Sequence, residues 1–326
     1  MDPSIDDPNR FKTGVSKGLS KGWSGFIWLL KIILPVSFAT GLLVHLGLIY
    51  KLDFLLTPLM NWMGLPASAA LVLVAGIFTG IYGTVAAMSA MPFSMDQMIL
   101  MAVFTLIAHN LIQESLVQGN SGINPVFAAL FRLFSAFGVT FVCARVMGVD
   151  PGGLAAAAAF APEVSQTFGQ WLSQWGMGTL KLIIQIFCII MPLMVMLEWA
   201  KLYHVIPVIT RIFSPVLSLL GLDRSTGMLW LTAAFFGLAY GSAVIVEETR
   251  NTEYDRDELT KLHLSVGINH AMIEDPALFL PLGIPPFWLW IPRLIAAMIA
   301  VYLFSAFSFL RRRYAERAGH QKIRHH

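Results

Sequence analysis

The sequence predicts an all-α, polytopic membrane protein with two inverted-topology repeats, each with about three full spans plus short interfacial and re-entrant helices. Of its 326 residues, 56% are hydrophobic and only 13% are charged, whereas a soluble domain carries roughly 25% charged residues. Apolar runs of about 20 residues, the length that crosses a bilayer, recur along the chain. Short patterns in the first half also return about 160 residues later, as expected of the internal repeats found in many membrane transporters.

The apolar runs and the polar segments between them divide the chain into five parts. These are a basic tail at 1–22, a first repeat at 23–147, a linker at 148–178, a second repeat at 179–309 and a basic tail at 310–326. The full spans expected within the repeats are 23–50, 67–91, 125–147, 179–199, 228–246 and 287–309. The apolar stretch 54–64 is about half the length needed to cross, so it is expected to be interfacial or re-entrant.

Four patterns of the first repeat recur in the second. They are a Ser/Thr-Pro pair followed by Gly-Leu, a Tyr-Gly pair, a carboxylate inside an apolar stretch, and Gly-Ile-x-Pro followed by Arg-Leu. The last pattern begins at Gly122 and again at Gly283. Membrane helices are rich in Gly and Pro in general, so a single match would mean little. Agreement at four places is the reason for inferring a duplication.

The positions of the basic residues predict the topology. Both tails are rich in Lys and Arg, and the linker has neither, so both termini are expected in the cytoplasm and the linker outside. Each half must then cross an odd number of times, which inverts one copy relative to the other, as in many secondary transporters. The segment 247–261 fits less well, because it would lie outside while carrying three basic residues.

Two carboxylates at predicted membrane depth, Glu114 and Glu274, are the strongest functional candidates. An ionisable group there costs at least about 2.5–3.5 kcal/mol, so it is seldom present without a partner or a pathway. His270 precedes Glu274 by four residues and shares its helical face, and Asn110 precedes Glu114 in the same way. The remaining candidates for substrate binding or coupling are His109, Asn269, Asp275, Arg132 and Arg293.

These polar residues also have structural explanations. Glu114 can form an internal ion pair with Arg132, and Glu274 with Arg293; alternatively, the arginines bind an anionic group of a solute. A buried Asn often joins two membrane helices rather than binding a ligand. On the functional interpretation, protonation of His270 or Glu274 couples transport to a proton gradient.

Several classes of function are disfavoured. His270-x3-Glu274 is not the HExxH metalloprotease pattern, no third metal ligand can be assigned, and no Gly-x-Ser-x-Gly or Walker pattern occurs. We therefore predict no enzyme activity, no cofactor and no metal site. Cys143 and Cys188 lie in separate apolar segments, which argues against a disulfide framework. Without a folded basic domain, the tails indicate an anionic membrane surface rather than nucleic acid.

The stretch from Tyr240 to Glu248, followed by LHLSVGINHAMIED from Leu262 to Asp275, resembles the nucleoside recognition (Gate) domain. That domain occurs in spore maturation proteins, in concentrative nucleoside transporters and in the membrane part of ferrous iron transport protein B. The resemblance covers residues 206–300 and extends more weakly over 50–140. It implies a helical transport module whose two copies face each other. It does not fix the substrate, since members are associated with nucleosides, metal ions and other roles.

Together, these observations predict a secondary transporter or permease for a small polar solute, nucleoside-like or an organic anion, with optional proton coupling and a pseudo-symmetric carboxylate site at the membrane midplane. A divalent cation pathway is one alternative, which requires ionised carboxylates. A non-transporting scaffold, or a protein of lipid-linked precursors in envelope or spore assembly, is another. The expected location is the bacterial inner membrane, with the lipid bilayer and a small-molecule or ion substrate as partners. A homodimer is compatible with the sequence.

Overall fold

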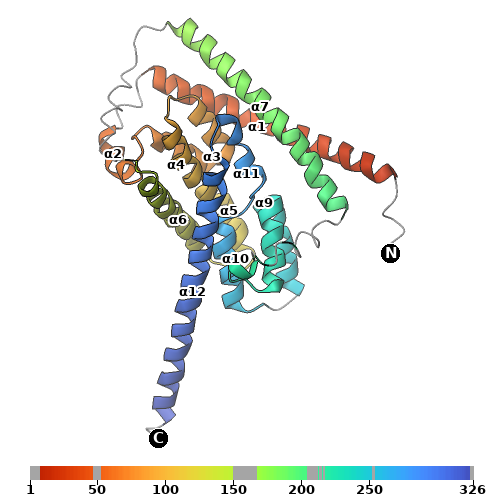
Figure 1. The fold of residues 1–326 in the computed structure, drawn as a ribbon, viewed down its shortest axis with the longest axis vertical. Coiled ribbons are helices and arrows are strands. Elements are labelled where there is room, and N and C mark those ends of the chain that lie inside the picture. Colours follow the sequence, from red (N-terminus) through yellow and green to blue (C-terminus); the bar gives the residue numbers. More distant parts are fainter. Residues whose placement is uncertain are drawn as a thin grey trace.

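The computed structural model describes residues 8–46, 53–149, 167–203, 217–251 and 254–323, together with positions 212 and 215. Within these residues the regular elements are helices (Figure 1). The first half contains α1 (Pro8–His45), α2 (Asp53–Trp62), α3 (Ala69–Ser89), α4 (Met95–Ala108), α5 (Leu111–Gly119) and α6 (Pro125–Val146). The second half contains α7 (Phe168–Leu202), α9 (Arg224–Asn251), α10 (Arg256–Ile268), α11 (Glu274–Ala277), the 3₁₀ helix η3 (Leu280–Leu282) and α12 (Pro286–Ile323).

Helices long and apolar enough to cross a bilayer account for much of the described chain. There are five among the described residues: Ala69–Ser89, Met95–Gly119, Pro125–Val146, Phe168–Met196 and Pro286–Tyr314. Large apolar side chains also stay exposed on α6 and α12; Phe134 is 70% exposed and Leu303 67%. Such surface is unfavourable in water and is what lipid would cover. The predicted all-α polytopic membrane fold is confirmed.

Two of the expected spans differ from the observed helices. In the region 23–50, the described apolar helix is confined to Ile33–Leu42, and residues 47–50 lie outside the described part of the chain. In the region 228–246, α9 is interrupted at Gly237, where φ is 76° and ψ is 170°. Because a residue in that conformation cannot continue the helical hydrogen bonds, the apolar stretch shortens to Thr226–Phe235.

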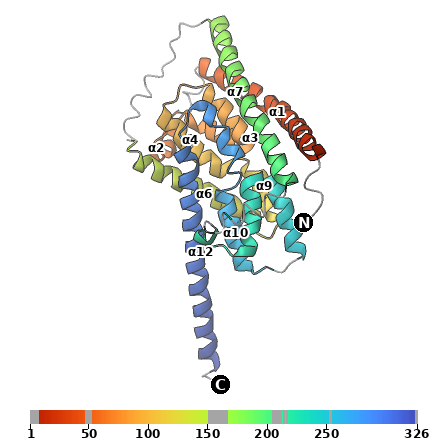
Figure 2. The ribbon, with the colours of Figure 1, turned by 45° about the vertical axis from the view of Figure 1, so that its right-hand side comes forward.

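Both basic tails contribute residues to helices. α1 begins at Pro8, and α12 continues to Ile323. A helix of 38 residues is about 57 Å long at 1.5 Å per residue, well beyond a hydrocarbon core of about 30 Å. Figures 1 and 2 show the C-terminal part of α12 projecting from the other helices. Arg311, Arg312 and Arg313 therefore lie on a helical extension.

The first helices of the two halves, α1 and α7, pack along each other (Figures 1 and 2). Glycines at positions 14, 18 and 22 of α1 make this close approach feasible, since a Cβ at Gly18 would lie only 2.5 Å from the Cα of Val195. Small residues four apart are a known means of bringing membrane helices together. Lys21 Nζ also lies 2.7 Å from Glu198 Oε1 across the pair.

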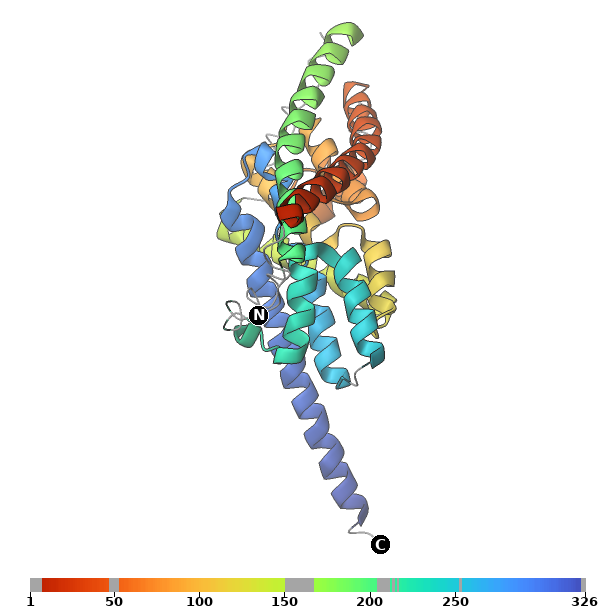
Figure 3. The same cartoon turned by 90° about the vertical axis from the view of Figure 1, so that its right-hand side faces the viewer.

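The remaining helices surround the polar centre of the molecule. In the first half α3 packs on the broken pair α4–α5, and in the second α9 packs beside α10, as Figure 3 shows below the middle of the view. α3 and α9 are each interrupted at a glycine, Gly80 (φ 80°) and Gly237 (φ 76°). Among the described residues, Asn110 and Ala271 are the two non-glycines with positive φ, at 43° and 45°.

These matching breaks are what a duplication predicts. The glycine breaks are 157 positions apart and the positive-φ residues 161 apart, so the second half carries a short extra length between them. That extra length falls in the region of 247–261, which has no equally long counterpart in the first half. The inverted orientation of the two copies, and the domain boundaries given above, stay predictions.

Candidate functional site

Two interrupted helices bring their breaks together at the centre. α4 ends at Ala108 and α5 begins at Leu111, while α10 ends at Ile268 and the short α11 begins at Glu274. Each break is attached to the neighbouring helix by main-chain hydrogen bonds, and the second break has an additional one from the Met272 amide to the Ala234 carbonyl (2.6 Å). The amide of Asn110 donates to the carbonyl of Gly76 in α3 (3.1 Å), and that of Ala271 donates to the carbonyl of Ala233 in α9 (3.2 Å).

A buried histidine precedes each of these anchored residues. His109 Nδ1 lies 3.0 Å from the Thr105 carbonyl oxygen, and His270 Nδ1 lies 2.9 Å from that of Val266. A carbonyl oxygen only accepts hydrogen bonds, so Nδ1 carries the proton in both rings and Nε2 is directed elsewhere. The ring centroids are 5.0 Å apart with an interplanar angle of 32°. The two halves therefore meet through their imidazoles.

Carboxylates from both halves reach the Nε2 atoms. Glu114 Oε1 is 3.2 Å from His109 Nε2, and its Oε2 is 3.1 Å from His270 Nε2 and 2.6 Å from Arg132 Nη2. Asp275 Oδ2, from the second half, is 3.2 Å from His109 Nε2. Glu114 thus contacts the second half and Asp275 contacts the first. We call His109, Glu114, His270 and Asp275 the central cluster.

Two arginines with no exposed surface hold the backbone at the breaks. The last carbonyls of a helix have no partner within it, and these arginines supply one. Arg132 donates to the carbonyls of Ile107 (2.9 Å) and His109 (3.0 Å), and Arg293 donates to those of Ile268 (3.1 Å) and His270 (2.7 Å). Much of each guanidinium is therefore engaged in supporting a broken helix.

The correspondence between the two repeats differs from the one predicted. The sequence pairing set Asn110 against His270 and Glu114 against Glu274, 160 positions apart. In the structure, the shared hydrogen bonds pair His109 with His270 and place Glu114 opposite Asp275, 161 positions apart. The expected pairing of Asn110 with His270 is therefore wrong. The prediction aligned Glu114 with Glu274. The backbone contacts instead align Glu114 with Asp275, one residue later in the sequence.

Several predicted site residues lie at the edge of the central cluster. Glu274 Oε1 accepts a hydrogen bond from the Tyr82 hydroxyl (3.3 Å). Asn110 lies against the break in α3, since a Cβ at Gly80 would come within 2.7 Å of the Asn110 amide nitrogen. Asn269 is fully buried, and its side-chain amide atoms have no hydrogen-bond partner among the described residues. The ion pair suggested for Glu114 with Arg132 is present.

Contacts not anticipated from the sequence join the halves beside the cluster. Gln118 Nε2 donates to the His263 carbonyl (3.2 Å), and His263 Nε2 lies 3.1 Å from the Ser121 carbonyl. Tyr82 was likewise not a candidate. One signal was available: Gly122 and Gly283 are 161 positions apart, as are the two Arg-Leu pairs. If the whole polar centre is aligned with this spacing of 161 positions, His109 is paired with His270.

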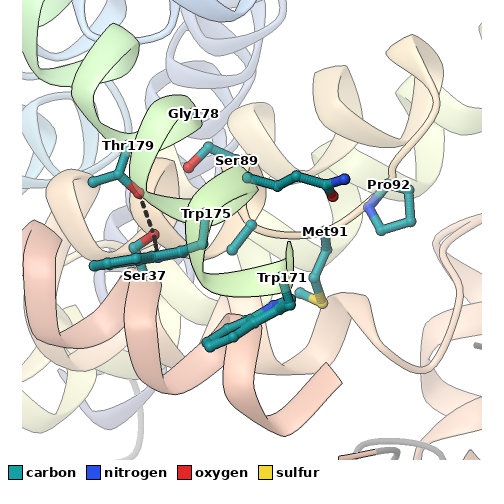
Figure 4. Close-up of a pocket in the computed structure, with 11 residues that line it drawn as sticks. Ser37, Ser89, Met91, Pro92, Trp171, Trp175, Gly178 and Thr179 are labelled. Carbon is teal, nitrogen blue, oxygen red and sulfur yellow. Dashed lines mark hydrogen bonds between the residues drawn. The ribbon is translucent and has the colours of Figure 1, made fainter. Parts of the chain in front are cut away.

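A separate cavity of about 340 Å³ opens between α1, α7 and the end of α3. Figure 4 shows Trp175 and Thr179 of α7 turned toward Ser37 of α1. Trp175 Nε1 donates to Ser37 Oγ (3.0 Å), which lies 3.4 Å from the Thr179 hydroxyl. None of the candidate site residues lines this cavity.

Comparison with known proteins agrees with this architecture. Residues 26–149 match the family model described as "Gate: Nucleoside recognition", and the long apolar helices agree with a multi-pass membrane protein. The match confirms the predicted resemblance and lies on the first half, where the resemblance was expected to be weaker. The chain is similar to the uncharacterized membrane protein YvoD of Bacillus subtilis (strain 168), with 29% identity over 294 residues, 89% of this chain and 92% of YvoD. No solved structure matches the chain.

Proposed function

We propose that the protein is a secondary transporter that binds a small polar solute at the central cluster. One observation carries the proposal: two interrupted helices, one from each half, place two histidines and two carboxylates against one another in the interior. Discontinuous helices that meet at membrane depth are a recurring way to build substrate sites in secondary transporters. The Gate match over residues 26–149 supports a transporter-like role.

The chemistry of the cluster limits the solute. Carboxylate oxygens accept hydrogen bonds, and an imidazole Nε2 can donate when protonated or accept when neutral. These groups suit a solute with hydroxyl or amine groups, or a cation. Ionisable groups at this depth are costly unless they are paired or line a pathway. Since Arg132 compensates Glu114 directly, Asp275 is the acid with more of its charge left for a ligand.

The arginine pair supports a second candidate. A carboxylate that is compensated inside the protein, like Glu114 with Arg132 at 2.6 Å, can serve folding alone. On that view the protein is a membrane scaffold that moves nothing, and the central cluster fixes how the two halves pack. The two candidates differ in whether a solute reaches the cluster.

Uptake by the purified full chain in proteoliposomes distinguishes them. Radiolabelled nucleosides, organic anions and divalent cations would be offered with and without an inward proton gradient. We expect one class to accumulate, with loss of uptake in Glu114→Gln and Asp275→Asn. The matched control is Glu258→Gln. Glu258 is a partly buried acid of α10 that pairs with Lys261 at 2.6 Å, outside the central cluster.

The same vesicles test proton coupling. If Glu274 and its Tyr82 partner exchange a proton during transport, Glu274→Gln should retain uptake down a solute gradient and lose its dependence on the proton gradient. Uptake of every solute class at the level of empty vesicles, from protein whose folding is verified by its thermal transition, would reject transport and favour the scaffold.

A further inference from the structure

The arrangement of donor atoms points to a more specific ligand. We propose that the central cluster binds one divalent first-row transition-metal ion, through His109, His270 and Asp275, with Glu114 as the fourth ligand. This names the solute of the site described above, and to that extent it rests on the proposed function. It departs from the prediction that the chain has no metal site, which was made because no third ligand could be assigned from the sequence.

The spacing of the donor atoms fits such an ion. His109, His270 and Asp275 each offer one ligand atom, and these atoms lie within 4.8 Å of one another. Neighbouring nitrogen and oxygen atoms across the cluster are 3.1–3.2 Å apart. A tetrahedral shell with bonds of about 2.0–2.1 Å has its ligand atoms about 3.3 Å apart. An ion at the centre therefore needs only small side-chain movements.

Both imidazoles are prepared as ligands by their second contacts. The hydrogen bonds from His109 Nδ1 to Thr105 and from His270 Nδ1 to Val266 place the proton on Nδ1. The lone pair of the neutral ring is then on Nε2, the atom that faces the cluster. Metal-binding histidines commonly donate their other ring nitrogen to a carbonyl or carboxylate, which fixes the tautomer and the orientation of the ring.

Two buried atoms of the cluster are left without a hydrogen bond. His270 has no exposed surface, and its Nε2 has no hydrogen-bond partner, although Glu114 Oε2 is 3.1 Å away. Asp275 Oδ2 is in the same condition, whereas Glu114 Oε2 lies 2.6 Å from Arg132 Nη2. Burying such atoms costs free energy unless a ligand satisfies them. His270 Nε2 and Asp275 Oδ2 therefore point to a common partner at the cluster.

The charges at the centre also favour a cation. Glu114 uses one oxygen for Arg132 and presents the other, Oε1, to His109, so it can compensate the arginine and still bind an ion. Asp275 adds a second negative charge beside the two imidazoles. Arg293 opposes a cation, but it is held by two main-chain carbonyls at 3.1 and 2.7 Å. Two carboxylates with two neutral imidazoles form a common donor set for a dication.

The donor types indicate which ions are favoured. Mg²⁺ and Ca²⁺ prefer oxygen ligands alone, whereas Cu⁺ prefers thiolates and thioethers. A set of two imidazole nitrogens and two carboxylate oxygens suits Zn²⁺, Co²⁺, Fe²⁺ or Mn²⁺. No cysteine belongs to the metal-ligating group found among the described residues.

Binding of Co²⁺ tests the inference independently of transport. The full chain would be purified without a histidine tag and with His320, His325 and His326 replaced by glutamine, because C-terminal histidines can bind Co²⁺ by themselves. We expect one Co²⁺ per chain by elemental analysis and a visible absorption typical of tetrahedral Co²⁺, displaced by Zn²⁺ and unaffected by Mg²⁺. His109→Ala and Asp275→Asn should each weaken binding by more than about 100-fold, since losing even a second-contact partner costs about 10–100-fold.

Asp275→Asn is nearly isosteric and keeps the comparison valid if His109→Ala does not fold. The matched control is His263→Gln, since His263 is also buried on α10 but contacts the Ser121 carbonyl outside the cluster; it should bind Co²⁺ like the parent. No stoichiometric Co²⁺, or Co²⁺ binding equal in the parent and in Asp275→Asn, overturns the inference. Metal binding without vesicle uptake of any solute class, Co²⁺ and Zn²⁺ included, would reject the transport proposal alone. Uptake of nucleosides or anions without metal binding would reject the metal site alone.

Discussion

The breaks of the two repeats use the same backbone chemistry and different side-chain charges. In each, a histidine Nδ1 contacts the carbonyl four residues before it, and an arginine spans two carbonyls of the broken helix. The acids differ: Glu114 reaches Arg132 and both histidines, whereas Asp275, one methylene shorter, contacts His109.

This difference separates the groups that support the backbone from the groups that set the charge of the central cluster. The groups that satisfy the broken backbone are the same in both halves, because any helix break leaves the same unpaired carbonyls. The groups that set the charge at the centre are not, so the cluster is asymmetric within a symmetric frame. Glu274 adds to the asymmetry, because the residue 161 positions before it is the uncharged Gln113.

The largest difference between the halves is expected from removing the arginines. Arg132→Ala should destabilise the protein by about 3–5 kcal/mol, because it leaves the Glu114 carboxylate buried without its partner. Arg293→Ala removes two main-chain contacts and should cost less, about 2–3 kcal/mol. Thermal unfolding in detergent, monitored by tryptophan fluorescence, shows which variant loses more stability. The exposed Arg312→Ala is the control, and an equal loss in the two buried variants would contradict the asymmetry.

Substitution of the glycines at the two breaks should give a smaller difference in stability between the halves. Gly80 and Gly237 have φ near +80° and extended ψ, a region almost restricted to glycine, so Gly→Ala at either costs about 1–3 kcal/mol. At Gly80 the new Cβ would also come within 2.7–3.0 Å of the Asn110 amide, whereas at Gly237 it meets Ala271 Cβ at 3.7 Å.

Gly80→Ala should therefore lower the unfolding temperature more than Gly237→Ala. The double variant Gly80→Ala/Asn110→Gly serves as the control, since it removes the contact, leaves the strain at position 80 and places glycine at the positive φ of position 110. It should recover part of the loss. If Gly80→Ala is the milder of the two single variants, the contact with Asn110 does not distinguish the two breaks.

The smallest effect concerns how the inner helices begin. α4 starts with Ser94, whose hydroxyl accepts from Gln97 while Gln97 accepts from the Ser94 amide, and neither side chain titrates. α10 starts with Asp255, which accepts from the Asp257 amide at 3.2 Å. A hydrogen bond from Ser308, with Arg312 nearby, lowers the pKa of Asp257 below its ordinary value.

A lowered pKa in the folded protein means that the contact stabilises above the unfolded value of about 3.9 and is lost as pH falls through the folded pKa. Between pH 7 and pH 3, amide protection at residues 256–261 should therefore fall relative to residues 95–100, by less than about 1 kcal/mol. Hydrogen exchange corrected for its intrinsic pH dependence measures this. Asp257→Asn at pH 7 should reproduce the change, and a parallel fall at both helix starts would contradict it.

The sequence predicted the class of fold and much of the centre. Apolar length identified the spans at 67–91, 125–147 and 287–309, and the isolated acids in apolar surroundings identified Glu114 and its neighbours as the polar centre. The close pairing of α1 with α7 was not predicted, because the glycines at 14, 18 and 22 lie in what composition describes as a basic tail. Their role depends on a partner helix about 180 residues away.

The sequence by itself determined that this chain enters a membrane and that each half carries a helix break beside an acid, because transfer into lipid depends on local composition. Only the tertiary structure decided that His109 faces His270 and that Asp275 acts opposite Glu114. A shift of one residue turns a side chain by about 100° around a helix, so the choice between neighbouring acids depends on how two segments about 160 residues apart pack together.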